Sequence, residues 1–212
     1  MRFAAPLTLL ALLAGCPGDD QGGPDAMAGS GLVVSWLPTP AAVPGPVDDK
    51  LALTSARFAL RSFRVIGDAG AGDPRTTVDT ALVRWDAGVA PMPIGLAAAP
   101  PGLYARMAWE LDGGAGLAYE LTGTVEQDDV ATPFAIRDAE ALPVSLDLAV
   151  TAEPGVVTTI VIRVELDAIV DAVDFEAVPL VGGVRVLAAG DPQLPRVRTE
   201  VAKAFGFHDS DQ

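Results

Sequence analysis

Two residue types that often carry chemistry occur once each in this chain, a cysteine at Cys16 and a histidine at His208. A thiolate is a strong nucleophile, and histidine is the usual general base near neutral pH and the commonest metal ligand. A Ser-His-Asp or Cys-His centre would have to use His208 in the terminal sequence FGFHDSDQ, and no G-x-S-x-G motif is present. Zinc and copper sites built from histidine and cysteine need several of these ligands in one place. We therefore expect no catalytic triad, no bound transition metal and no cofactor.

The residues before Cys16 have the order of a secretory signal. Arg2 supplies a positive side chain, an apolar run extends from residue 3 to residue 13, and small residues follow it. A helix of that length covers about 16 Å, roughly half of the hydrocarbon layer, which is too short for a permanent membrane span. We interpret residues 1–15 as a signal peptide that is removed after export.

The sequence Leu13-Ala14-Gly15-Cys16 resembles the lipobox of bacterial lipoproteins. In that family the thiol forms a thioether with diacylglycerol, the peptide is cut before the cysteine, and the new amino end is usually acylated. The resemblance implies that Cys16 anchors the chain to a membrane, since two or three acyl chains make release very slow. It also implies a lipid-anchored location in the bacterial cell envelope, at the outer membrane or at the periplasmic face of the inner membrane. The alternative is ordinary signal cleavage with Cys16 as a free thiol.

Carboxylates are the remaining chemical groups, because the chain has 28 Asp and Glu. Glycan hydrolases need only two carboxyl groups about 5 to 9.5 Å apart, so a carboxylate-dependent glycan hydrolase is one alternative function. The loop GDAGAGDP at residues 67–74 and the pair Asp128-Asp129 could offer oxygen ligands to calcium, and a calcium-binding envelope domain is another alternative. Neither segment has the D-x-[DN]-x-[DN]-G pattern with its distal Glu, and we interpret both as solvated turns.

The charge balance bears on the partners of the chain. Only 14 Lys and Arg offset the acids, and the formal net charge is −14. Such an excess disfavours nucleic acid and anionic headgroups as partners. A single cysteine cannot form an internal disulfide, so the stability of the fold has to come from burial of apolar groups. Hydrophobic residues make up 50% of the sequence, which is enough for a sizeable core.

Alternating apolar and polar residues predict β-strands along most of the chain. In the first long segment Phe58 and Leu60 share one face, whereas Arg57 and Arg61 point the other way. Phe63 and Val65, the next apolar residues, fall on the opposite parity from Phe58 and Leu60. This reversal predicts a β-bulge near Ser62. Other strands are expected at residues 32–37, 81–85, 103–111, 117–125, 142–150 and 156–166.

Two short helices are expected near the C-terminus, at residues 167–174 and within residues 193–205. In the second, Leu194, Val197, Val201 and Phe205 recur at i, i+3, i+7 and i+11. Short strands separated by turns, with few helical patterns, predict a mainly β fold. We expect an antiparallel β-sandwich of immunoglobulin or transthyretin type with one or two short C-terminal helices.

The chain divides into four parts by composition. The signal peptide is followed by a flexible tether at residues 16–31, which is rich in Gly, Pro and Asp and has few apolar side chains to offset the entropy of ordering. The sandwich with its helices is expected at residues 32–207. Residues 208–212 are expected to form a disordered tail.

The sequences LTSARFALRSFRVIGD, PPGLYARMAWEL and EPGVVTTIVIRVELDAIVDAVDF resemble in their layout a group of uncharacterised bacterial lipoprotein domains of the DUF4382 type. The resemblance covers about residues 32–175. It implies a transthyretin-like or immunoglobulin-like sandwich and no activity.

Aromatic side chains could form a stacking platform for sugars if they were exposed together. The alternation places Trp85, Trp109 and Tyr119 on apolar faces and predicts that they belong to the core. Only Tyr104, on the same face as Arg106, is predicted to be exposed, and one ring is no platform.

These observations predict a membrane-anchored envelope lipoprotein whose biochemical role is unknown. We favour a binding or structural module over an enzyme, partly by analogy with other sandwich domains. Its expected partners are the membrane, through the lipid anchor, and an envelope protein or the cell wall, with no nucleic acid.

Overall fold

The longest strand, β3 (Leu51–Gly67), organises the larger of two sheets in a computed structural model that describes residues 31–68, 70 and 72–208. The first half of β3 pairs with β7 (Tyr119–Gln127) and the second half with β6 (Gly102–Leu111). The other edge of β3 pairs with β4 (Thr77–Trp85). Seventeen residues of strand extend about 55 Å, at roughly 3.3 Å per residue, so one strand can serve all three neighbours.

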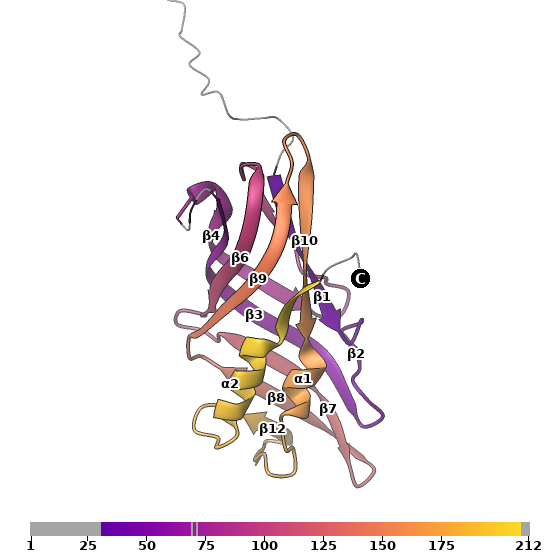
Figure 1. The fold of residues 1–212 in the computed structure, drawn as a ribbon. Helices are drawn as coiled ribbons and strands as arrows, with labels where there is room; N and C mark the ends of the chain where they lie inside the picture. The colour runs from indigo at the N-terminus through magenta and orange to yellow at the C-terminus, as the bar shows by residue number, and fades with distance from the viewer. Residues whose placement is uncertain (1–30, 69, 71, 209–212) are drawn as a thin grey trace, which may run out of the picture.

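The two sheets pack against each other around one core, and the mainly β, sandwich-like fold predicted from the sequence is confirmed. Pairing is antiparallel except between β1 and β10 and between β8 and β12. Figure 1 shows the β9–β10 hairpin at one end of the domain and the helices at the other.

The smaller sheet has the order β13 (Phe205–His208), β10 (Val157–Glu165), β1 (Gly31–Thr39), β5 (Ile94–Leu96). The larger has the order β11 (Leu180–Val181), β12 (Val184–Leu187), β8 (Val130–Asp138), β7, β3, β6, β9 (Leu142–Ala152), and β2 (Gly45–Pro46) also pairs with β3.

The predicted bulge in the long strand is confirmed. Ser62 has a φ of 52°, a conformation that is uncommon for a residue with a side chain, and the pairing of β3 with β6 shifts between Arg61 and Arg64. The shift turns Leu60 and Phe63 to the same, buried face. A single strand therefore presents a continuous apolar face although its alternation is interrupted.

Aromatic side chains fill the centre of the core. Trp36 of the smaller sheet meets Trp109 of the larger sheet edge-to-face at a centroid distance of 6.1 Å. Phe205 lies 5.2 Å from Trp109 and 5.3 Å from Phe58, so β13 joins the same cluster. Trp85, Trp109 and Tyr119 are buried as predicted.

Tyr104 is buried, and the prediction that it is exposed is wrong. Its side chain is 2% exposed, and its hydroxyl donates a hydrogen bond to the carbonyl oxygen of Pro100 at 2.6 Å. The pairing of β6 with β9 shifts between Tyr104 and Arg106. This irregularity changes the parity of the strand, which places Tyr104 on the same side as Met107 instead of beside Arg106.

Two short α-helices lie toward the C-terminus, as predicted, with slightly different bounds. α1 (Leu166–Asp171) follows β10 directly, and α2 (Leu194–Lys203) has a proline in its first turn, where the missing N–H costs nothing. A short 3-10 helix, η1 (Pro74–Thr76), precedes β4. Leu194, Val197 and Val201 of the predicted apolar stripe are buried in α2, and Phe205, the fourth, is buried in β13.

Candidate functional site

The predicted lipid anchor, Cys16 with Leu13, Ala14 and Gly15, lies outside the described residues. The first described strand, β1, begins at Gly31, which is paired with Val157 at the start of β10. Figure 1 shows this point beside the β9–β10 hairpin, at the opposite end from α1 and α2. Among the described residues, no helix has the length and the apolar character needed to cross a bilayer.

His208 lies in a strand and not in the terminal tail to which the sequence analysis assigned it. It is the last residue of β13 and pairs with Val161 of β10. Residues 209–212 are outside the described part of the chain. Within residues 31–68, 70 and 72–208 there is no group of three or more His, Cys, Asp or Glu side chains that could hold a metal ion.

The acidic loops singled out as calcium candidates make contacts within the protein. Asp68 accepts a hydrogen bond from the backbone N–H of Leu103 at 3.2 Å. Asp73 caps η1 and forms an ion pair with Arg75 at 2.9 Å. Asp128 and Asp129 occupy the β7–β8 turn with φ values of 50° and 61°. The first loop therefore uses two of its carboxylates to fix its own conformation.

A polar concavity of about 650 Å³ lies at the helical end of the domain. Its charged centre is Arg185 of β12, whose Nη1 donates to the carbonyl oxygen of Val178 at 2.8 Å and whose Nη2 donates to Oε1 of Gln127 at 2.7 Å. Acidic side chains outnumber basic ones around it, so the concavity suits a polar or positively charged group. Its charged lining residues are Asp48, Lys50, Glu126, Asp128, Asp174, Glu176 and Arg185.

A partly buried ionic cluster joins α2 to the larger sheet. Asp138, at the end of β8, is 3% exposed and accepts hydrogen bonds from Nε and Nη2 of Arg198 at 2.6 and 3.1 Å. The hydroxyl of Tyr119 lies 3.4 Å from the same carboxylate, and Glu140 Oε2 lies 2.6 Å from Nη1 of Arg198. The cluster closes the gap between helix and sheet, which is a structural role.

The pKa values within this cluster move in opposite directions. Burial by itself raises the pKa of Asp138, but hydrogen bonds from Arg198 and from the backbone N–H of Glu140 outweigh it and leave the pKa lowered. Burial, and then the charge of Asp138, raise the pKa of Tyr119. Asp138 is therefore a stable anion and Tyr119 a stable neutral donor, and neither is suited to exchange protons near neutral pH.

Asp171, the last residue of α1, is an acid whose pKa is raised. The causes are partial desolvation and then the charges of Asp167 and Asp48. A carboxyl group of this kind can act as a general acid when it faces a cleft. Asp171 is exposed at the surface of the helix and does not line the concavity beside it.

No protein family, curated protein or solved structure matches the chain. The resemblance to bacterial lipoproteins and to DUF4382-type domains therefore stays a prediction. The contact between Asp138 and Arg198 was not predicted. These residues are 60 positions apart and have no local motif in common, so only the fold brings them together.

Proposed function

We propose that this chain is a lipid-anchored protein of the bacterial envelope whose folded domain is a binding or structural module. The observation that carries the proposal is the sequence Leu13-Ala14-Gly15-Cys16 directly after an apolar run. Thioether lipidation needs a cysteine at this point. In this chain the only cysteine is found there.

The arrangement of the domain supports the proposal. In Figure 1 the described chain starts beside the β9–β10 hairpin, whereas β12, which carries Arg185, lies at the helical end. Arg185 lines the polar concavity. A chain anchored through residues that precede Gly31 can present its helical end and its sheet faces to partners in the envelope. Its net charge of −14 keeps such a domain from lying on an anionic bilayer.

Metabolic labelling with an alkyne analogue of palmitate tests the anchor. The wild-type chain should incorporate the label and migrate as the processed form, and Cys16→Ala should lose the label and accumulate as precursor. Ser30→Ala, which lies between the lipobox and β1, is the matched control and should be labelled as wild type. Label in Cys16→Ala at the wild-type level would contradict the proposal.

Carboxylate-dependent glycan hydrolysis is the second candidate, and the raised pKa of Asp171 beside Asp167 favours it. An enzyme of this class should lose about 10² to 10⁴-fold in rate when its general acid is removed. We expect no turnover of a panel of envelope glycans by the purified chain. Hydrolysis that is abolished by Asp171→Asn and retained in Asp129→Asn would establish the enzyme instead.

A further inference from the structure

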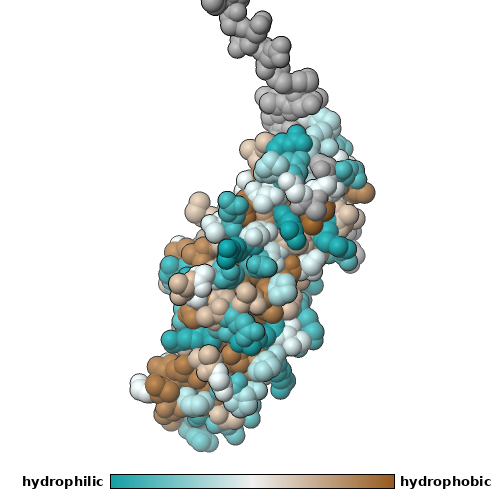
Figure 2. Space-filling model, turned by 90° about the vertical axis from the view of Figure 1, so that its left-hand side faces the viewer, coloured by the Kyte–Doolittle hydropathy of each residue, from teal (hydrophilic) through white to brown (hydrophobic). Residues whose placement is uncertain are grey.

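The outer face of the larger sheet collects arginine side chains. In β3 the buried residues Phe58, Leu60 and Phe63 alternate with outward-facing arginines. Figure 2 views the domain from its β4 side and shows hydrophilic residues interspersed with hydrophobic ones over most of this face, with a hydrophobic group at the lower left. We call the following set the arginine face: Arg57, Arg61 and Arg64 of β3, Arg84 of β4, Arg106 of β6 and Arg137 of β8.

Two of these arginines lie directly opposite each other. Arg57 pairs with Arg84 on one side and with Glu120 of β7 on the other, and Glu120 pairs in turn with Arg137. Neighbouring strands are about 4.8 Å apart, and like charges at opposed positions destabilise a sheet. This row therefore holds three guanidinium groups against one carboxylate within a chain that has 28 acids in all.

Four of the arginines have carboxylate partners. Arg61 pairs with Asp112 at 2.8 Å, Arg106 with Asp147 at 3.2 Å, Arg137 with Glu120 at 3.9 Å, and Arg84 with Asp86. Within the described part of the chain, the side chains of Arg57 and Arg64 make no ion pair or hydrogen bond. These two guanidinium groups keep their donors available for a ligand.

The surface around the two unpaired arginines is hollowed. Arg64 and Ser62 together line two shallow hollows of about 530 and 580 Å³, and Arg106 lines the second of these as well. Arg57 lines a third hollow of about 310 Å³ together with Leu82, which is 48% exposed. Each hollow also has one acid in its lining, Asp79, Glu110 and Glu120 in turn, and in the second and third hollows two arginines outnumber that acid. Hydroxyl groups and the planar fork of arginine are donors that suit a carboxylate, and the exposed leucine adds an apolar contact.

We propose that the arginine face docks an acidic segment of a partner protein, with carboxylates of the segment bound by Arg57 and Arg64. The inference rests on the proposed function as a binding module and names the surface and the chemistry of the partner. The net charge of −14 disfavours two other partners. A long polyanion would extend beyond the arginine face onto negatively charged surface, and a second copy of the chain carries the same net negative charge. A short acidic segment interacts only with the local positive charge.

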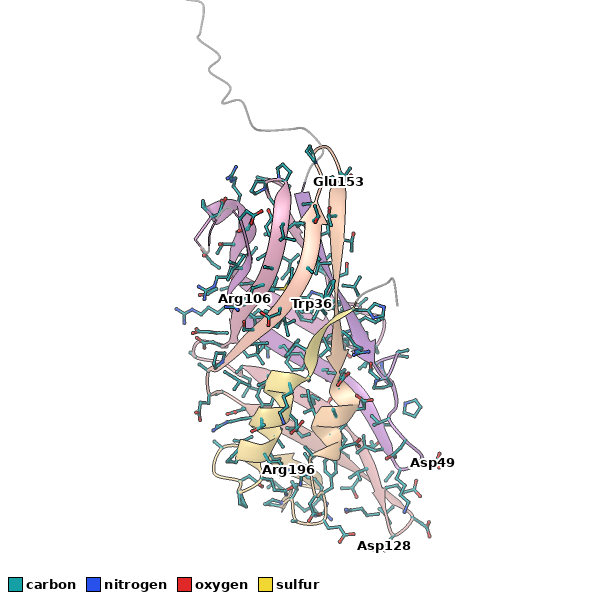
Figure 3. All side chains as sticks on the ribbon, viewed as in Figure 1. Trp36, Asp49, Arg106, Asp128, Glu153 and Arg196 are labelled. Carbon is teal, nitrogen blue, oxygen red and sulfur yellow. The ribbon has the colours of Figure 1, made fainter. Side chains whose placement is uncertain are left out.

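The test measures binding of a fluorescein-labelled, Glu-rich dodecapeptide to the full chain as the cell processes it, purified in a non-ionic detergent. Its fluorescence anisotropy should rise on binding, and the affinity should fall between about 50 and 200 mM salt, because exposed charges are screened. The double variant Arg57→Gln/Arg64→Gln should bind roughly tenfold more weakly, and Arg57→Lys/Arg64→Lys should recover part of the affinity. Arg196→Gln is the matched control. Figure 3 shows Arg196 on α2, well away from Arg106 at the side of β6.

Several outcomes would overturn the inference. An equal loss of peptide affinity in Arg196→Gln would mean that the peptide responds only to net charge. Absence of binding at low salt would show that the arginine face is not a binding site. Tighter binding of polyphosphate than of the peptide would assign the face to a polyanion. Self-association in sedimentation that disappears in the double variant would assign it to a second copy. Anisotropy is measured on the purified protein, so a failed labelling test at Cys16 would contradict the anchor without changing this result.

Discussion

Removing Arg198 should destabilise the fold more than any ordinary surface change. Breaking a buried ion pair by deleting one partner costs about 3–5 kcal/mol, because the other charge remains buried. Asp138 is 3% exposed, which fits that case, but the side chain of Arg198 is 25% exposed, so water reaches part of the pair. For Arg198→Met we therefore expect a loss of about 2–3 kcal/mol in the free energy of unfolding.

Urea unfolding followed by tryptophan fluorescence measures this loss, since Trp85 and Trp109 lie in the core and report its exposure. Asp138→Asn removes the charge and keeps an acceptor for Glu140. If the cost comes from the stranded carboxylate, the double variant Asp138→Asn/Arg198→Met should lose less than the sum of the two single losses.

Two results would refute this reasoning. A loss below about 1 kcal/mol in Arg198→Met would mean that water satisfies Asp138 without the arginine. Additive losses in the double variant would mean that the two side chains act independently. Arg196→Met is the control, because Arg196 is an exposed arginine on the same helix, and we expect its effect to stay within about 0.5 kcal/mol.

The same carboxylate makes stability depend on pH. The pKa of Asp138 is lowered in the folded chain, since hydrogen bonds from Arg198 and Glu140 outweigh its burial. A group of this kind stabilises the fold above its unfolded pKa of about 3.9, and the contribution is lost as the pH falls through the folded pKa. Below about pH 4 the urea midpoint of wild type should therefore fall more steeply than that of Asp138→Asn.

Two further predictions concern packing. A Cβ added at Gly123 would lie 2.1 Å from the carbonyl oxygen of Ala52, so Gly123→Ala should lower the free energy of unfolding by about 1–3 kcal/mol. Gly95→Ala in β5 is the control, because nothing lies within 4 Å of the added Cβ, and its loss should be less than half as large. Tyr104→Phe should lose about 1 kcal/mol, because it removes the hydrogen bond to Pro100; an unchanged urea midpoint would show that this bond adds nothing.

Alternation predicted the parts of the fold in which one face of a strand is buried. It worked for β3, where the reversal of parity between Leu60 and Phe63 could only be accommodated by an extra residue, and Ser62 is that residue. It failed at Tyr104, because nothing local indicates the second irregularity in β6. A bulge shows in the sequence only when the residues on both sides of it are clearly apolar.

β8 illustrates a different limit. Its sequence VATPFAIRD includes Pro133, which argues against a central strand, and its residues 134–136 are buried in succession and do not alternate. β7 pairs with one edge of β8 and β12 with the other, in parallel, so β8 is a central strand in spite of its proline. The pairing of β8 with β12 joins residues about 50 positions apart, and no local pattern in a single sequence encodes it.

The alternation that predicts the buried side of β3 also predicts the arginine face, which lies on the side of the strand that points away from the core. The apolar residues of β3 settle which side faces inward, and the arginines between them are then confined to the other side. Intramolecular acids occupy four of the six, whereas Arg57 and Arg64 stay unpaired although the chain has twice as many acids as bases. Arg57 lies opposite Arg84, whose carboxylate partner is Asp86, and opposite Glu120, which is the partner of Arg137, so neither neighbouring acid is left for the Arg57 guanidinium. A partner that brings its own carboxylates to this face would supply the acceptors that Arg57 and Arg64 lack.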